Sequence, residues 1–290
     1  MTVREEVVTD GYLDLVTRLL QRCRLSDPTG GLWEAGDFQW WWRRVRPSDR
    51  RGQLFWRDVR GEPVAGVILN DWDAMWACDV IVSPEHLPEL FDAVWRRALE
   101  RMDELQPATV EVRARDDDTT TRTALAEAGF APAGDNDTTT WLDAVRRPQV
   151  SPLAGGFELR SRAETADRPH HMIRRNGEHV AERLAECSLY DPELDLLIEA
   201  PNGDVAGYAL FWLDPVTRVG LVEPMRVEEP YQRLGLAKHL LTAGIDRLVA
   251  RGCERLKVSY WDENAPAKAL YLGAGFVPES TSRVYRPSPA

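Results

Sequence analysis

The two halves of this 290-residue chain carry the same order of residues, and this repeat limits the fold more than any single motif. Val64-Ala65-Gly66 and Val205-Ala206-Gly207 each follow a turn of glycine and an acidic residue. A single gap-free register then aligns the positions downstream: Pro84 with Pro230, Leu90 with Leu236, Val112 with Val258, Asp116 with Asp262, and Ala128-Gly129-Phe130 with Ala274-Gly275-Phe276. The length suits two domains that each bury a core. The repeat therefore predicts two copies of one domain.

In the second copy, the turn Tyr231–Ala237 joins a strand to a helix. Apolar residues alternate over Val219–Val227, which predicts the strand, and recur with helical spacing over Leu236–Leu248. Gly235 lets the backbone approach a ligand closely. The first amides of the helix lack intrahelical acceptors and carry the positive end of its dipole. The turn therefore predicts a site for a diphosphate group.

A second block follows at residues 256–276. Residues 256–260 are rich in β-branched and aromatic side chains, which predicts a short strand. Asn264 is a good N-cap, and Pro266 is tolerated in the first turn of a helix. That helix must end near Gly273 or Gly275. Upstream, Phe157–Arg160, Asp191–Glu199 and the run after the Gly203-Asp204 turn read as further strands.

Both blocks resemble the GNAT superfamily of N-acetyltransferases, whose pyrophosphate loop reads Gln/Arg-x-x-Gly-x-Gly/Ala. The resemblance implies an acetyl-CoA site, with no metal. Its phosphate contacts would come from the loop and the first turn of the helix: Gln232, Arg233, Leu234, Gly235, Leu236, Ala237 and Lys238. The strand before the loop would pair its backbone with the pantetheine arm at Met225, Arg226 and Val227, and Asn264 would touch the cofactor.

Acetyl transfer to an amine needs a group that accepts the ammonium proton and one that protonates the departing thiolate. Tyr271 matches the helix tyrosine that serves the leaving sulfur in the GNAT family. Glu223 is a candidate base, with a surface ion pair as the alternative role. Pro224 cannot donate to a ladder and predicts a bulge or an opened edge in its strand. A two-residue period would place Glu223, Met225 and Val227 on one face.

The first copy has lost the residues of the phosphate site. Glu89 stands opposite Gly235, Phe91 opposite Ala237, and Leu125 opposite Tyr271. A carboxylate at a pyrophosphate site repels the ligand. We therefore expect a degenerate, non-catalytic domain at 1–145, a Pro/Gly-rich linker at 146–156 and a catalytic domain at 157–290. The expected fold class is α/β (α+β), with two tandem GNAT-fold domains, each a central mixed, mostly antiparallel sheet flanked by helices.

The amino-acid composition limits the classes of binding partner that the protein could have. A net charge of −11 disfavours nucleic acid or an anionic membrane and is compatible with a cationic amine. Four cysteines lack metal or redox spacing, and the sequence shows no signal region or membrane span. The expected location is the cytoplasm. Arginine nearly replaces lysine, which indicates the composition of a GC-rich bacterial genome. His170 and His171 read as surface or loop residues, and His239 as solvent-facing rather than catalytic. The Trp40–Trp42 run with Arg43-Arg44 reads as an amphipathic helix packed into the core or the domain interface, rather than as a nucleic-acid site or a ligand cleft.

The function expected from this resemblance is an acetyl-CoA-dependent N-acyltransferase that acts on the amine of a small molecule by direct attack on the thioester. The arrangement resembles the tandem GNAT members of the mycothiol synthase type, in which one half is degenerate. The alternative is a non-catalytic binding or regulatory module that holds acyl-CoA or no ligand. The acceptor amine, the length of the acyl group and the oligomeric state are left open, because acceptor sites are built from variable loops.

Overall fold

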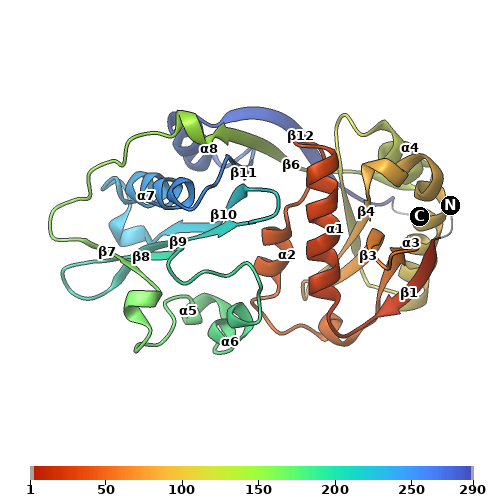
Figure 1. Cartoon of the computed structure of the whole chain (residues 1–290), viewed down its shortest axis with the longest axis horizontal. Coiled ribbons are helices and arrows are strands. Elements are labelled where there is room, and N and C mark those ends of the chain that lie inside the picture. The colour runs from red at the N-terminus through yellow and green to blue at the C-terminus, as the bar shows by residue number, and fades with distance from the viewer. Residues whose placement is uncertain (1–2, 289–290) are drawn as a thin grey trace. The chain divides into compact units, whose positions relative to one another are not determined.

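The computed structural model describes residues 3–288, which form two compact units. Unit 1 holds the chain up to Phe38, Val45–Asp137 and the stretch from Ser280 onward. Unit 2 holds Gln39–Arg44 and Thr138–Glu279. Each unit contains a mixed, mostly antiparallel sheet with helices packed on it, so the expected fold class is confirmed (Figure 1).

In unit 1 the strand order is β1-β2-β3-β4-β5-β12. Its strands are β1 (Arg4–Val8), β2 (Gln53–Arg57), β3 (Pro63–Asp71), β4 (Trp76–Val82), β5 (Val110–Arg115) and the end of β12 (Val277–Pro287). Its helices are α1 (Tyr12–Ser26), the start of α2 (Ala35–Trp41), α3 (Leu87–Leu105) and α4 (Thr119–Glu127). Strands β4 and β5 run parallel, whereas β1–β2, β2–β3, β3–β4 and β5–β12 pair antiparallel.

In unit 2 the strand order is β6-β11-β10-β9-β8-β7. Its strands are the end of β6 (Phe130–Asp143), β7 (Glu158–Ser161), β8 (Asp195–Glu199), β9 (Val205–Leu213), β10 (Val219–Val227) and β11 (Arg255–Trp261). Its helices are α5 (Ile173–Asn176), α6 (Val180–Ala185), α7 (Leu236–Ala250) and α8 (Ala265–Gly273). Within this unit the sheet separates α7 from α5 and α6 (Figure 1).

The units are not contiguous stretches of chain. Unit 2 takes β6 from Thr138 onward, where the Thr140 hydroxyl donates to the Val258 carbonyl at 2.8 Å. Unit 1 takes the end of β12, where Ser282–Tyr285 pair antiparallel with β5. The division at 145 and 157 expected from the sequence differs from this arrangement. The final strand of each copy pairs with a sheet edge that is open to it, and this edge need not belong to the sheet nearest in sequence.

Helix α7 holds unit 2 together by packing on β9. Its inward side chains are all buried in the core of the unit: Leu236, Leu240, Leu241, Ile245 and Leu248. Burying each of these side chains stabilises the folded state by about 1.5–3 kcal/mol. A Cβ at Gly244 would lie 2.0 Å from the Phe211 ring, so only glycine permits this close approach. The helix predicted from periodicity is confirmed.

The repeat also appears in local geometry. The Asn264 side chain caps α8 by accepting from the Ala267 amide at 3.1 Å, and Asp118 caps α4 by accepting from the Thr121 amide at 2.9 Å. The N-cap prediction for Asn264 is confirmed, and α8 ends at Gly273 as expected. Local capping signals therefore place the same helix in both copies.

The linker segment is anchored rather than flexible. The Ser151 amide donates to the Thr242 hydroxyl at 3.0 Å, and His239 Nδ1 donates to the Ser151 carbonyl at 2.6 Å. The His239 side chain is therefore largely buried against this segment, and its expected exposure to solvent was wrong. The four cysteines are free thiols, and no helix in residues 3–288 is long and apolar enough to cross a membrane.

These pairings predict that residues 151–290 do not fold as an isolated fragment. The fragment lacks β6, which borders β11, and lacks Gln39–Arg44, which belongs to unit 2. It also keeps the end of β12 without β5. We expect aggregation or a broad, non-cooperative urea transition measured by circular dichroism. A soluble fragment with one sharp, cooperative transition would contradict this expectation.

Candidate active site

Strand β10 is interrupted by a bulge at the position of Pro224. Its register with β9 shifts between Val222 and Met225, as the proline predicted. The indole of Trp212 donates to the Glu223 carbonyl at 2.7 Å, which holds the bulged backbone. The two-residue period used for Glu223 does not continue through the bulge. Only Met225 and Val227 share a face, and both pack against the core of the unit.

Beyond the start of β10, its edge toward β11 is open. The two strands pair in parallel only at Val219–Leu221, although β10 continues to Val227. The Glu228 amide donates to Ala206 of β9 at 2.9 Å. Because amides alternate along a strand, those of Val227 and Met225 point away from β9, toward the open edge. The edge thus offers free donors to an extended ligand.

The loop after β10 presents the amino end of α7. Gly235 is the N-cap residue with φ +78°, and Arg233 also has a positive φ of 64°. Gln232, Arg233, Leu234 and Lys238 are exposed, whereas Leu236 is buried in the core. The Gln232 amide group donates to the Val227 carbonyl at 3.3 Å. The loop therefore keeps its first helical amides and two cationic side chains accessible to an anion.

Glu223 and Tyr271 lie within electrostatic reach of one another. Burial raises the pKa of the Tyr271 hydroxyl, and the negative charge of Glu223 raises it further. Tyr271 is buried in the core of unit 2 between the rings of Tyr260 and Phe276, with ring centroids 6.4 and 6.1 Å away. Its hydroxyl therefore stays protonated near neutral pH and is able to donate a proton.

Asn264 lies at the exposed start of α8, where its carbonyl oxygen is engaged by the Ala267 amide. Its side-chain NH₂ group has no hydrogen-bond partner among residues 3–288. A cofactor contact would therefore use this NH₂ group and not the capping oxygen.

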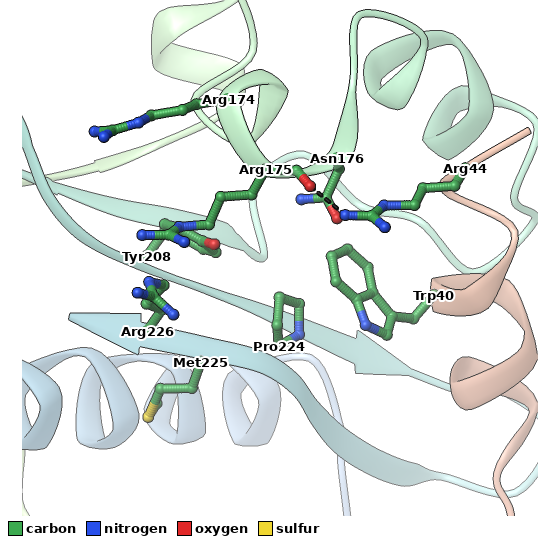
Figure 2. Close-up of a pocket in the computed structure, with 9 residues that line it drawn as sticks. All are labelled: Trp40, Arg44, Arg174, Arg175, Asn176, Tyr208, Pro224, Met225 and Arg226. Carbon is green, nitrogen blue, oxygen red and sulfur yellow. Dashed lines mark hydrogen bonds between the residues drawn. The ribbon is translucent and has the colours of Figure 1, made fainter. Parts of the chain in front are cut away.

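A pocket of about 420 Å³ opens beside the bulge, within unit 2 (Figure 2). It is lined by Trp40, Arg44, Arg174, Arg175, Asn176, Tyr208, Pro224, Met225 and Arg226. Sequence reasoning noted the Trp-Arg run at 40–44 and favoured core packing. Trp40 is indeed buried, yet it also forms a wall of the pocket. Arg174, Arg175 and Tyr208 were missed, and the adjacent arginine pair was the available signal.

Behind the pocket lies a buried polar cluster around Asp195. His170 Nε2 donates to Asp195 Oδ2 at 3.1 Å, and the Tyr190 hydroxyl donates to the same atom at 2.8 Å. His171 Nε2 lies 3.1 Å from Asp195 Oδ1, within ion-pair distance but without hydrogen-bond geometry. Both residues lie in a loop, as one of the two expectations had it, but both imidazoles are nearly inaccessible, so the expectation of a surface position was wrong.

The cluster has the composition of a metal site but is arranged by hydrogen bonds. Its three ligand atoms lie within 4.8 Å of one another. However, His170 Nδ1 accepts the Met172 amide at 3.2 Å, so Nε2 carries the hydrogen that it donates to Asp195. A nitrogen that bears this hydrogen offers no lone pair to a metal. The His171 ring packs on Tyr208 at 5.5 Å, which supports the pocket wall.

We expect Asp195→Ala to destabilise the protein by about 3–5 kcal/mol, because it leaves buried histidines without their carboxylate. Burial acts to raise the pKa of Asp195, but the charge of His171 and the hydrogen bond from His170 outweigh it and lower the pKa. The stabilisation is therefore complete above about pH 4, the unfolded value, and is lost as the pH falls below it. Urea unfolding at pH 7 and pH 3 measures both effects.

The matched control for this prediction is Glu182→Ala, which removes an exposed carboxylate 3.1 Å from His179. We expect a change below about 1 kcal/mol there, because exposed ion pairs contribute little. Equal losses in the two variants would contradict a special contribution of the buried cluster.

Unit 1 lacks the features that form this site. Strand β4 pairs with β3 in one continuous register, without a bulge. Helix α3 begins at Leu87, so Glu89 is already helical where unit 2 has its positive-φ glycine. Phe91 is buried and stacks on Trp95 at 6.4 Å. In unit 1 a turn of helix therefore occupies the place that the loop before α7 takes in unit 2.

Residues 156–276 match the profile of the acetyltransferase (GNAT) family. Residues 156–276 are therefore a GNAT acetyltransferase domain, and the chain as a whole shares the fold of tandem GNAT proteins. Its likeness to a tandem GNAT protein from the clavulanic acid biosynthesis pathway covers both chains completely, with a TM-score of 0.71 at 15% identity. A GCN5-related N-acetyltransferase from Sphaerobacter thermophilus shares the fold with a TM-score of 0.63 at 17% identity, over 98% of this chain and 95% of that one.

Two mycothiol acetyltransferases are similar in sequence. The protein from Beutenbergia cavernae is 30% identical over 150 residues, which is 47% of this chain and 50% of that protein. The protein from Clavibacter michiganensis subsp. michiganensis is 35% identical over 105 residues, 36% of this chain and 33% of that protein. The chain thus matches half or less of the length of these relatives.

Proposed function

We propose that the protein is an acetyl-CoA-dependent N-acetyltransferase whose second domain, 157–290, is catalytic. The observation that carries this proposal is the opened edge of β10, which runs from the phosphate loop to Glu223 and Tyr271. The GNAT profile over residues 156–276 supports acetyl-CoA as the donor. The copy at 1–145 would be degenerate and non-catalytic, apart from Gln39–Arg44 and the end of β6, which belong to unit 2, and residues 146–156 would connect the two copies.

The donor would bind along the open edge. Its diphosphate would accept from the first amides of α7, with Arg233, Lys238 and the side chain of Gln232 nearby. The pantetheine arm would pair with the amides of Met225 and Val227, as a strand pairs with a neighbour. The carboxamide of Asn264 would add a donor from α8. This course brings the thioester to the bulge.

At the bulge, Glu223 would take a proton from the acceptor ammonium, so that the amine attacks the thioester carbonyl. The C–N bond forms as the C–S bond breaks, and Tyr271 would give its proton to the departing sulfur. The new amide nitrogen would then lose its extra proton to the Tyr271 oxygen, and Glu223 would release the first ammonium proton to water. The raised pKa of Tyr271 supports this role, because the hydroxyl remains a donor at neutral pH. The nearby pocket beside Pro224 would admit the acceptor.

Release of free thiol from acetyl-CoA over a panel of amines tests the proposal, with acetylated product confirmed by mass spectrometry. Amine-dependent release supports it. Tight binding of acetyl-CoA without release from any amine would instead indicate a non-catalytic binding module.

Glu223→Gln should lower kcat/KM by roughly 10²- to 10⁴-fold, the range of a general base, with little change in acetyl-CoA affinity. Glu229→Gln is the matched control, since Glu229 is exposed just beyond the same strand. The rate of the Glu223 variant should rise with pH, as unassisted deprotonation of the amine takes over. A wild-type rate and pH profile in this variant would assign proton removal to another group.

A further inference from the structure

The pocket beside the bulge is strongly cationic in a protein that is acidic overall. The whole chain carries a net charge of −11. Among the nine described residues that line the pocket, four are arginines and none is acidic (Figure 2). The pocket is therefore positively charged although the whole protein is negatively charged, and such a pocket raises the local concentration of an anionic ligand.

Internal ion pairs neutralise only part of this charge. Glu228 accepts from Arg175 through both carboxylate oxygens, at 3.1 and 2.6 Å, and from Arg226 Nε at 3.3 Å. One carboxylate thus serves two guanidinium groups, and these hydrogen bonds lower the pKa of Glu228 so that it stays charged. The Arg175 and Arg226 side chains keep 37% and 39% of their surface exposed.

The remaining two arginines have no acidic partner. Arg44 donates to the backbone carbonyl of Arg175, which leaves its charge uncompensated. Arg174 has no hydrogen-bond or ion-pair partner among residues 3–288. The cluster therefore retains positive charge and unused N–H donors in the fork geometry that matches carboxylate and phosphate.

The rest of the lining is suited to an organic body attached to that anion. Tyr208 stands opposite Arg226 across the β9–β10 pair, and the Trp40 ring forms another wall. Figure 2 shows Arg175, Arg226 and Tyr208 gathered on one side of β10, whereas Met225 points to the other side. Of the two bulged residues, Pro224 lines the pocket and Glu223 is its neighbour in the chain.

We propose that the acceptor is an amine that also carries an anionic group, a carboxylate or a phosphate, which the Arg44–Arg175–Arg226 cluster binds while the amine lies at the bulge. This inference rests on the proposed function and replaces the cationic amine suggested by the net charge. The anion fixes the orientation of the acceptor, so its contribution appears in kcat/KM for the acceptor and not in binding of the donor.

Matched acceptor pairs test this specificity with the full-length protein: phosphoethanolamine against ethanolamine, glucosamine 6-phosphate against glucosamine, and β-alanine against β-alaninamide. We expect the anionic member of at least one pair to have at least a ~10-fold higher kcat/KM, since a hydrogen bond to a charged group changes affinity by about that factor. Acetylation of amines with no preference for the anionic members would overturn the inference while leaving the proposed function intact.

Variants then assign the preference to the pocket. Arg44→Gln and Arg175→Gln should each lower kcat/KM for the anionic member about 10-fold or more and change the neutral member little. Arg175→Lys keeps the positive charge but loses the forked N–H donors. Its kcat/KM for the anionic member should therefore lie between those of the wild type and Arg175→Gln. Arg251→Gln, at the far end of α7, is the control. An unchanged preference in both glutamine variants would overturn the assignment.

A binding measurement does not depend on turnover. Inorganic phosphate is titrated into protein saturated with CoA, which occupies the donor site, and Arg44→Glu should remove the phosphate signal. No phosphate signal in the wild type would count against the site. The donor itself is checked with acetyl-dephospho-CoA. If the arginine variants raise KM only for acetyl-CoA that carries the 3′-phosphate, the cluster binds the donor and the inference is overturned.

Discussion

Tyr271→Phe is expected to lower kcat by roughly 10²- to 10⁴-fold, the usual contribution of a general acid, and to leave the Kd of acetyl-CoA almost unchanged. The change removes only the hydroxyl and keeps the ring that packs between Tyr260 and Phe276. The proton is needed mainly in the transition state, so turnover and not binding should respond. Thiol release at saturating substrate and calorimetric titration measure the two quantities.

Tyr260→Phe is the matched control, because this ring lies in the same core and is equally buried. It should lose neither turnover nor binding. Because the pKa of Tyr271 is raised above the ordinary value of about 10, the wild-type rate should show no loss attributable to this group below that pH. Wild-type turnover in Tyr271→Phe would show that the ring serves packing alone.

Gly235→Glu is expected to abolish acetyl-CoA binding. The new carboxylate would stand where the diphosphate accepts from the α7 amides, and φ of +78° is unfavourable for a side chain. A Cβ at this position meets no atom within 4 Å, so the fold has room for the substitution. A carboxylate at a helix amino end does not itself destabilise the helix. The loss should therefore appear in calorimetric binding while the thermal transition remains.

Gly235→Ala separates strain from charge, and we expect it to bind acetyl-CoA more weakly than wild type but measurably. The wild type should bind one acetyl-CoA per chain, because unit 1 has a helical Glu89 in place of the loop. Glu89→Gly should not create a second site, since helix α3 already runs through that position. Two equivalent sites in the wild type, or tight binding by Gly235→Glu, would refute this assignment.

The elements of the site followed closely from the sequence. The bounds of β10 coincide with the predicted strand, and the bulge lies where Pro224 interrupts it. The Asn264 cap and the start of α7 at Leu236 were also predicted. These features depend on interactions within a few residues, such as alternation of apolar side chains, a cap or a missing amide hydrogen. Such local signals can be recognised in a single sequence.

The pocket beside the bulge and the buried histidines could not be predicted in this way. The pocket joins Trp40 and Arg44 to residues 174–176 and to two neighbouring strands, and periodicity carries no information on such distant partners. His170 and His171 lie in a polar stretch that reads as exposed. They are buried around Asp195, which accepts a hydrogen bond from His170 and lies within ion-pair distance of His171.

The sequence by itself determined the tandem repeat, the strand–turn–helix of the phosphate loop and the loss of that loop in the first copy, because each rests on local residue chemistry repeated in register. Only the tertiary structure decided which last strand completes which sheet, that Gln39–Arg44 belongs to unit 2, and that four arginines converge beside the bulge. Those outcomes depend on long-range pairing of edges and charges, which exists only once the chain has folded.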